Sequence, residues 1–160
     1  EGETWTPVTV DGYRGAGVIT VEGNGHTISG LNNALFAGGF AGTSGIVIKD
    51  LTLDKMTIND STNTQGIGAF ICNVDSMPKI DLVNCRLTNS TITSTAGARV
   101  GGLVGWSSGY NKPNDGPVDT YVTITNCSVE NCEITKALWA VSSVTPVQTP
   151  PPITPSPTAR

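Results

Sequence analysis

Three stretches of the chain align without a gap: IVIKDLTLDKMTI at Ile46–Ile58, IDLVNCRLTNSTI at Ile80–Ile92 and VTITNCSVENCEI at Val122–Ile134. Their starts are offset by 34 and then 42 residues. Six aligned columns are apolar in every copy except at Ser90, and the columns between them are almost wholly polar. One face of each stretch is therefore predicted to be buried, and the other to contact water.

The spacing within each stretch indicates strands. Apolar positions follow one another at steps of 2, 3, 2, 3 and 2 residues, which is the alternation of short strands interrupted by corners and not the period of a helix. β-Branched residues dominate and strong helix formers are sparse, which also favours strands. Corners are predicted at Lys49–Asp50, at Asp54–Lys55 and at their equivalents, because Asn and Asp tolerate left-handed backbone. The two corner columns are Asp50, Asn84 and Asn126, and Lys55, Asn89 and Asn131.

A second repeated element gives each unit enough strand to wind once around a core. It reads ALFAGG at Ala34–Gly39, GAFICN at Gly68–Asn73 and GGLVGW at Gly101–Trp106. Stacked coils pair strand upon strand, so that interior backbone groups find partners in the next coil. The predicted fold is all-β: a short parallel β-helix, or solenoid, of about four coils, expected to be right-handed. The coils are expected at Trp5–Phe40, Ile46–Asn73, Ile80–Tyr110 and Val122–Val144.

Composition divides the chain into two parts, a β-helix repeat domain at 1–144 and a Pro/Thr-rich linker or stalk at 145–160. A chain of 160 residues is long enough for one core that is stable without staples. Ser142–Arg160 carries six of the ten prolines, which favours an extended polyproline II tail. Its Thr-Pro and Ser-Pro content is typical of O-glycosylated stalks. The candidate O-glycosylation sites are Thr145, Thr149, Thr154, Ser156 and Thr158.

Several motifs in order resemble a known family. VEGNGHTISGL at Val21–Leu31, ALFAGG, IKDLTL at Ile48–Leu53, VGGLVG at Val100–Gly105 and the Asn-Cys pairs together resemble the GLUG-motif repeats of large prokaryotic surface and secreted proteins. WTPV at Trp5–Val8 is similar to the lead-in of such repeats. The resemblance covers about residues 5–136. It implies a β-helical, multi-domain, extracellular or cell-surface protein, and it implies no shared catalytic residue.

Charge and hydropathy narrow the classes of partner that the chain is expected to bind. Only 14% of the residues are charged, the net charge is −4, and the nine Lys and Arg residues are scattered, so a nucleic-acid partner is not expected. No apolar run approaches membrane-spanning length, so membrane insertion is not expected either. Because no signal-like segment opens the chain, Glu1 is expected to start a processed or excised protein.

The four cysteines leave two interpretations open. Cys85 and Cys127 fall in one inward column on adjacent coils, so their Cα atoms are expected about 5 Å apart. This spacing is compatible with a disulfide, but buried thiols also stack as small hydrophobes, which is the preferred interpretation. The chain has no CxxC pair and one histidine, His26, so neither a metal site nor another cofactor is predicted.

Enzyme activity is a less favoured alternative, although β-helices often host polysaccharide lyases and hydrolases. Such enzymes need paired or clustered carboxylates, and the acidic residues of this chain are spread out. Stacking brings Asp54 towards Glu130 only across the coil that holds Thr88. Similarity of fold alone is weak evidence for an enzymatic activity, so the chain is predicted not to be an enzyme.

The longest insertion offers a different function, the binding of surface glycans or proteins. WSSGYNKPNDGP at Trp106–Pro117 combines aromatic faces with amides, which suit sugar stacking. The preferred interpretation is that the aromatic residues cover a coil edge while Gly and Pro shape the loop. The candidate ligand-binding residues are Trp106, Tyr110, Asn111, Asn114 and Asp115.

Three sequons mark candidate N-glycosylation sites at Asn59, Asn89 and Asn126. Asn59 and Asn89 are expected at exposed turns. Asn126 is the least favoured, because side chains of its corner column are expected to bond one another along the stack.

The two ends of a β-helix suggest a function. Each end presents unpaired strand groups that must be capped or used, and the candidate caps are Glu1–Val10 and Ala137–Val144. If the caps are incomplete, subunits stack end to end into a filament, with the Pro-rich tail along a neighbour. The predicted function is a non-enzymatic extracellular structural or surface module, displayed alone or self-assembled.

Overall fold

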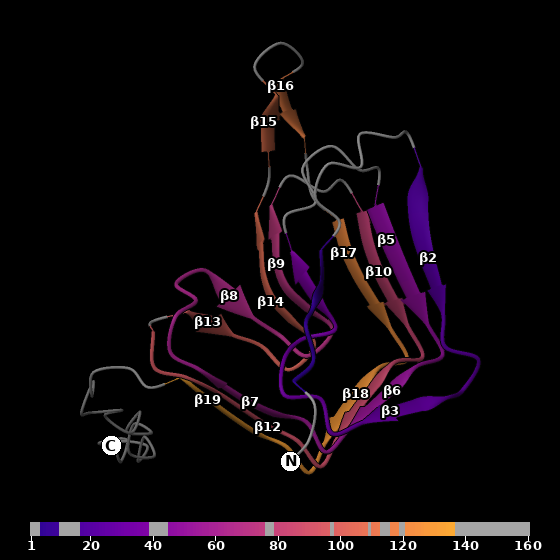
Figure 1. The fold of residues 1–160 in the computed structure, drawn as a ribbon. Helices are drawn as coiled ribbons and strands as arrows, with labels where there is room; N and C mark the ends of the chain where they lie inside the picture. The colour runs from indigo at the N-terminus through magenta and orange to yellow at the C-terminus, as the bar shows by residue number, and fades with distance from the viewer. Residues whose placement is uncertain are drawn as a thin grey trace, which may run out of the picture.

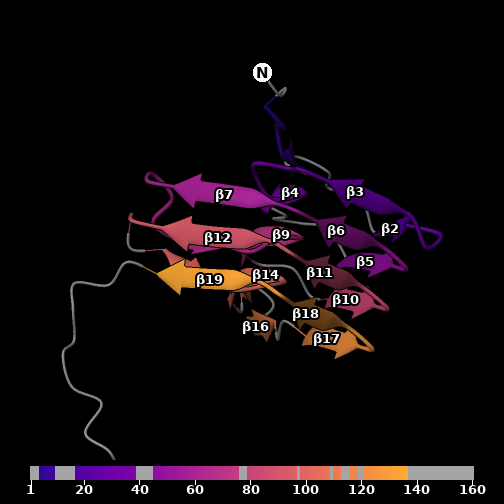
Figure 2. The ribbon, with the colours of Figure 1, turned by 90° about the horizontal axis from the view of Figure 1, so that it is seen from below.

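The computed structural model describes residues 4–9, 17–38, 45–75, 79–96, 98–108, 110–112, 116–118 and 121–136. These residues form strands joined by turns, and no helix occurs among them. Strands from successive parts of the chain stack in parallel sheets (Figure 1), an arrangement compatible with the predicted β-solenoid. Figure 2 shows the stacking from another side, with β7, β12 and β19 in one row and β3, β6, β11 and β18 in the next.

Four repeat units follow one another within the described residues. We call residues 17–38, 45–75, 79–108 and 121–136 the first, second, third and fourth unit. Each unit sends one strand to each of the first two sheets, and all pairings within the five stacked sheets are parallel. Sheet 1 contains β2 (Val18–Glu22), β5 (Gly45–Lys49), β10 (Lys79–Val83) and β17 (Tyr121–Thr125), and sheet 2 contains β3 (Thr27–Ser29), β6 (Thr52–Asp54), β11 (Arg86–Thr88) and β18 (Ser128–Glu130).

Sheets 3 and 4 have fewer strands than sheets 1 and 2, and sheet 5 begins with a strand that precedes the first unit. Sheet 3 contains β7 (Thr57–Asp60), β12 (Thr91–Ser94) and β19 (Glu133–Lys136), and sheet 4 contains β8 (Gly66–Ile67) and β13 (Arg99–Val100). Sheet 5 contains β1 (Val8–Thr9), β4 (Phe36–Gly38), β9 (Ile71–Asp75) and β14 (Val104–Ser108). An antiparallel hairpin of β15 (Tyr110–Lys112) and β16 (Gly116–Val118) projects away from the sheets between the third and fourth units (Figure 1).

The register of the strands confirms the gap-free alignment of the repeats. Ile80 of β10 pairs with Ile46 on one side and with Val122 on the other. The second repeated element also stacks from unit to unit, because Ile71 of β9 pairs with Phe36 and with Val104. Equivalent residues of successive units therefore lie in columns that run along the stack.

The inward columns form the core, but burial stops before the fourth unit. In the second and third units the inward side chains at Ile46, Leu53, Ile80 and Leu87 are completely buried. The prediction of a buried face is wrong for the third stretch of the alignment, whose large inward side chains lie on the last strand of each stack. Their exposed fractions are 40% for Val122, 51% for Ile124, 43% for Val129 and 37% for Ile134.

The corners have the predicted left-handed backbone. Lys55 has φ of 51° and its equivalent Asn89 has φ of 49°. Only one of these is Asn or Asp, the residues that adopt this conformation at low cost. The corner residues with positive φ are Asn24, Gly25 and Gly30 in the first unit and Asp50, Lys55, Asn84, Asn89, Asn126 and Asn131 in the later units.

Glycines allow sheets 4 and 5 to approach each other closely. A Cβ atom on Gly105 would lie 2.3 Å from the backbone nitrogen of Ile67, and one on Gly101 would lie 2.1 Å from the backbone oxygen of Val104. Any other residue would force the backbones apart. Residues 137–160 contain no glycine, so the sequence after the fourth unit lacks what this approach requires.

The N-terminal segment contacts the first unit. The indole nitrogen of Trp5 donates to the backbone oxygen of Ala34 at 2.9 Å, and the backbone nitrogen of Val8 donates to the backbone oxygen of Leu35 at 3.0 Å. These bonds agree with a capping role for the part of 1–10 that is described. The predicted cap at 137–144, the domain boundary at 144 and the tail at 145–160, with all five candidate O-glycosylation sites, lie outside the described residues.

Candidate functional site

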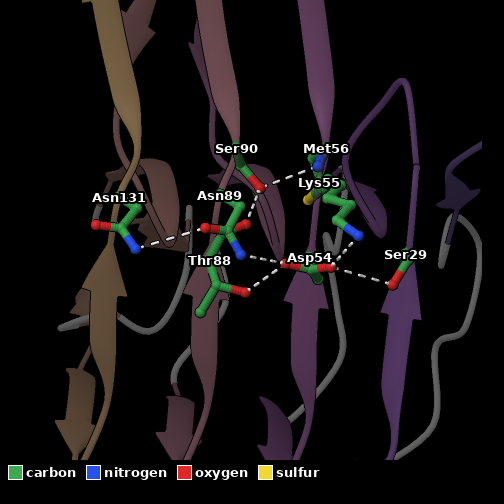
Figure 3. A network of polar contacts seen from close by, with 8 residues as sticks. All are labelled: Ser29, Asp54, Lys55, Met56, Thr88, Asn89, Ser90 and Asn131. Atoms are coloured by element: carbon green, nitrogen blue, oxygen red, sulfur yellow. Dashed lines mark hydrogen bonds and ion pairs between the residues drawn. The ribbon is translucent and has the colours of Figure 1, made fainter.

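A polar cluster of side chains lies at the corner between sheets 2 and 3, and it crosses all four units (Figure 3). We call Ser29, Asp54, Thr88, Asn89 and Asn131 the corner ladder. Asp54 accepts hydrogen bonds from the Thr88 hydroxyl and from the Asn89 amide, both at 2.8 Å. The Ser29 hydroxyl donates to the same carboxylate at 3.5 Å, and Asn131 donates to Asn89 at 3.5 Å.

The corner ladder also sets the protonation state of its carboxylate. Hydrogen bonds from Asn89 and then Thr88 lower the pKa of Asp54 below its ordinary value of 3.8, because they stabilise the charged form. The Lys55 ammonium contributes less, at 3.9 Å from a carboxylate oxygen and with 73% of its side chain exposed. Asp54 therefore remains ionised near neutral pH and joins three units through its oxygens.

Ser90 interrupts an otherwise apolar inward column, and the structure shows why it is tolerated. Its side chain is 3% exposed. The hydroxyl accepts from the backbone nitrogen of Met56 at 2.9 Å and donates to the backbone oxygen of Thr88 at 2.6 Å. A buried hydroxyl with both bonds made avoids the cost of burying an unpaired polar group. Ser90 thus supports the corner ladder from inside (Figure 3).

The outer face of the other corner holds a polar groove of about 420 Å³. Within it the Asn84 amide donates to the Asp50 carboxylate at 2.7 Å. The Arg86 side chain is exposed and, among the described residues, forms no ion pair. Arg86 was not among the site residues predicted from the sequence. Its outward position in the alignment does indicate that it lies on the same face as the corner column of Asp50, Asn84 and Asn126. The groove is lined by Gly25, Asp50, Thr52, Asn84, Arg86 and Asn126.

The predicted ligand loop is divided by the structure. Trp106 lies on β14 in sheet 5, and the Arg99 guanidinium of β13 stacks over its ring at 4.8 Å from the centroid. Tyr110 and Asn111 lie on β15 of the projecting hairpin, whereas Asn114 and Asp115 lie outside the described residues. The segment predicted as a loop is therefore partly a β-hairpin, with Trp106 on a stacked sheet before it.

The four cysteines are free thiols, and those of the third and fourth units face the preceding unit. The Cys85 thiol donates to the backbone oxygen of Ile48 at 3.4 Å, and the Cys127 thiol donates to that of Leu82 at 3.4 Å. Cys127 sulfur also accepts from the backbone nitrogen of Cys85 at 3.4 Å. Burial raises the pKa of Cys85 to about 11 and also raises the pKa of Cys72, which keeps both thiols protonated at neutral pH.

All three sequon asparagines are exposed, and Asn89 lies at a bend, as predicted. Asn59 lies within β7 and not at a turn, and its amide oxygen accepts from the Thr93 hydroxyl at 2.6 Å. Asn89 is the one engaged in a ladder, through Asp54. Asn126 lies at a corner with φ of 52°, and no hydrogen bond of its side chain is found within the described part of the chain.

Two further features bear on the classes of function. Within the described ranges, no three His, Cys, Asp or Glu residues are grouped as a metal site would require. Among the described residues, no helix is long and apolar enough to cross a membrane.

Comparison with known proteins adds no family. No family model, no curated protein and no solved structure matches the chain. The similarity to GLUG-motif repeats therefore rests on the motifs and their order.

Proposed function

We propose that the chain is a non-enzymatic structural module of the cell surface or extracellular space, built as a right-handed parallel β-helix of about four coils. Each repeat unit is then one coil. Right-handedness is the general rule for crossovers between parallel strands of one sheet. The similarity to GLUG-motif repeats and the Thr/Pro-rich tail support the extracellular setting.

The observation that carries the structural role is the use of Asp54. Its carboxylate is the type of group that a polysaccharide-cleaving enzyme would need. Here it accepts hydrogen bonds from Thr88 and Asn89 of the third unit and from Ser29 of the first. The bonding capacity of this carboxylate is thus directed to neighbouring units, and its contribution is to hold the stack together.

A double-mutant cycle tests this role. Asp54→Ala and Thr88→Val should each lower the free energy of unfolding, and the loss in the double variant should be smaller than the sum of the two single losses. Thr123→Val, an exposed threonine on β17, is the matched control and should show no coupling to Asp54. Cleavage of a uronic-acid polymer that is lost in Asp54→Asn, with stability unchanged, would overturn the structural role.

Binding of glycans or proteins through the projecting hairpin is the second candidate function. The observation in its favour is that β15 and β16 stand clear of the stacked sheets (Figure 1), where a partner has access. A glycan array comparing the wild-type chain with Tyr110→Ala tests it, and Trp106→Ala separates the hairpin from the Arg99–Trp106 contact. Binding that survives Tyr110→Ala would argue against the hairpin.

A further inference from the structure

Within the residues that the structure describes, the stack ends on an open apolar face. The last strands, β17, β18 and β19, contain five, three and four residues, and each has one strand edge without a partner among the described residues. Val122, Ile124, Val129 and Ile134 occupy the inward columns there, 37–51% exposed. Their equivalents one unit earlier, such as Leu82, are completely buried. One more layer of strands would complete this core.

The opposite end of the molecule has the matching geometry. β2 and β3 begin sheets 1 and 2 with five and three residues, the same lengths as β17 and β18. Through the register of sheet 1, Ile19 belongs to the column of Val122, and Val21 to that of Ile124. Ile19 and Val21 are only half-buried. A strand layer that joins the two ends would cover both sets of side chains.

Sheet 5 begins and ends one unit earlier than sheets 1 and 2, and this offset is the same at both ends of the molecule. At the last unit, sheets 1 and 2 extend to β17 and β18, whereas sheet 5 stops at β14 of the third unit. At the start, sheet 5 already contains β1, before β2 and β3 begin the other sheets. Because neighbouring strands have a constant spacing of about 4.8 Å, the translation that places β2 beside β17 also places β1 beside β14.

We propose that the end formed by β17, β18 and β19 binds the β1–β2–β3 end of a second copy of this chain, so that sheets 1, 2 and 5 continue in register from one molecule to the next. The inference rests on the proposed structural role. The contact joins two different surfaces head to tail, so it propagates into an open filament.

The polar columns suit the same register. Thr88 pairs with Asp54 on one side and with Glu130 on the other, and Asp54 pairs with Ser29. Head-to-tail stacking therefore places Ser29 of the next copy beside Glu130. The Ser29 hydroxyl already donates to the Asp54 carboxylate within the chain, and Glu130 offers it the same acceptor. The column of Thr125 likewise continues with Glu22, which brings no like charges together.

A second copy fits this end better than the tail of the same chain does. The open edge spans twelve strand residues. Residues 137–145 provide nine residues before the first proline of the tail, and the remaining fifteen include six prolines, which have no N–H for strand pairing. The first unit supplies strands of the required length and register for sheets 1 and 2, and β1 supplies one for sheet 5.

Sedimentation velocity and electron microscopy of the full chain across a range of concentrations test the proposal. The wild-type chain should form longer species as concentration rises. Ile124→Lys puts a charge into the contact at a side chain that is already half exposed, and it should reduce assembly at least tenfold. Thr123→Lys is the matched control, because Thr123 is exposed on the outward face of the same strand, and it should assemble like the wild type.

A full chain carrying Leu138→Ser and Trp139→Ser distinguishes the two candidates for covering this end, a second copy and the tail of the same chain. Assembly that persists in this variant supports a second copy. A wild-type chain that stays monomeric at every concentration, and that is destabilised both by this variant and by Ile124→Lys, would show that its own tail covers the end. That result would overturn the proposal and would leave the structural role of Asp54 intact.

Discussion

Leu82 and Ile124 are register partners on neighbouring strands of sheet 1, yet Leu82 is completely buried and Ile124 is 51% exposed. The two residues occupy the same inward column and have nearly the same apolar side chain. Their difference comes only from the number of strands beyond them. Burial in this fold is therefore a property of position along the stack, and the part of the stack that the structure describes has an unfinished end.

Alanine substitution at these two positions should give unequal losses of stability. Leu82→Ala leaves a cavity in a closed core and should lower the free energy of unfolding by about 2–5 kcal/mol. Ile124→Ala removes a side chain that already contacts water and should cost roughly 1 kcal/mol. Urea denaturation of the monomeric protein measures both. Equal losses would mean that another group covers Ile124.

The acid stability of the chain should depend on Asp54. Its pKa is lowered in the folded state, so the carboxylate contributes stability above its ordinary pKa of 3.8, and this contribution is lost as the pH falls through the folded value. Asp54→Asn should therefore be less stable than the wild type at pH 6, with a smaller difference at pH 2. Parallel stability curves for the two proteins would contradict this. Asp81→Asn, on the outward face of β10, serves as the control.

The left-handed corner at Lys55 should be improvable. Lysine pays a steric cost at its φ of 51°, whereas the equivalent residues Asn89 and Asn131 adopt this backbone more readily. Lys55→Asn should raise the free energy of unfolding by about 0.5–1 kcal/mol, and the ion pair it loses is exposed and long. Thr57→Asn, on β7, should give no gain. A gain of the same size at both positions would remove the backbone explanation.

The stability of the chain should fall at alkaline pH because of Cys85. Burial raises the pKa of this thiol from 9.0 to about 11, so its contribution is complete below pH 9 and is lost as the pH rises from 9 to 11. Guanidinium denaturation at pH 8 and pH 11 should show a smaller decline for Cys85→Ala than for the wild type. An identical decline would mean that Cys85 ionises equally readily in the folded and unfolded chains.

The stacking of equivalent residues in columns was predictable from the sequence, because each strand has apolar side chains on its inward face and polar side chains on its outward face. The steps between apolar residues predicted the stacking of Ile46, Ile80 and Val122, and the Asn and Asp residues predicted the corners. Exposure of the last unit was not predictable, because Val122 and Ile80 have the same local sequence signal. It depends on whether another strand layer follows.

The polar contacts were less predictable than the core. In the predicted stack Thr88 separates Asp54 from Glu130, two carboxylates that an enzyme would need close together, and the structure shows Thr88 as a hydrogen-bond donor to Asp54. The hairpin at β15 and β16 separates Tyr110 from Trp106 in the same way. In both cases the three-dimensional partners of a side chain, and not its type, decide its role.

Thiol cross-linking between copies tests the head-to-tail register most directly. Thr20 and Thr123 face outward in one column of sheet 1, so stacking places Thr20 of one copy beside Thr123 of the next, at a spacing that a disulfide can bridge. A mixture of Thr20→Cys and Thr123→Cys chains should yield a disulfide between these two positions, identified by mass spectrometry, whereas Thr27→Cys mixed with Thr123→Cys should not. Absence of the Thr20–Thr123 cross-link, or equal cross-linking in both mixtures, would contradict end-to-end stacking in register.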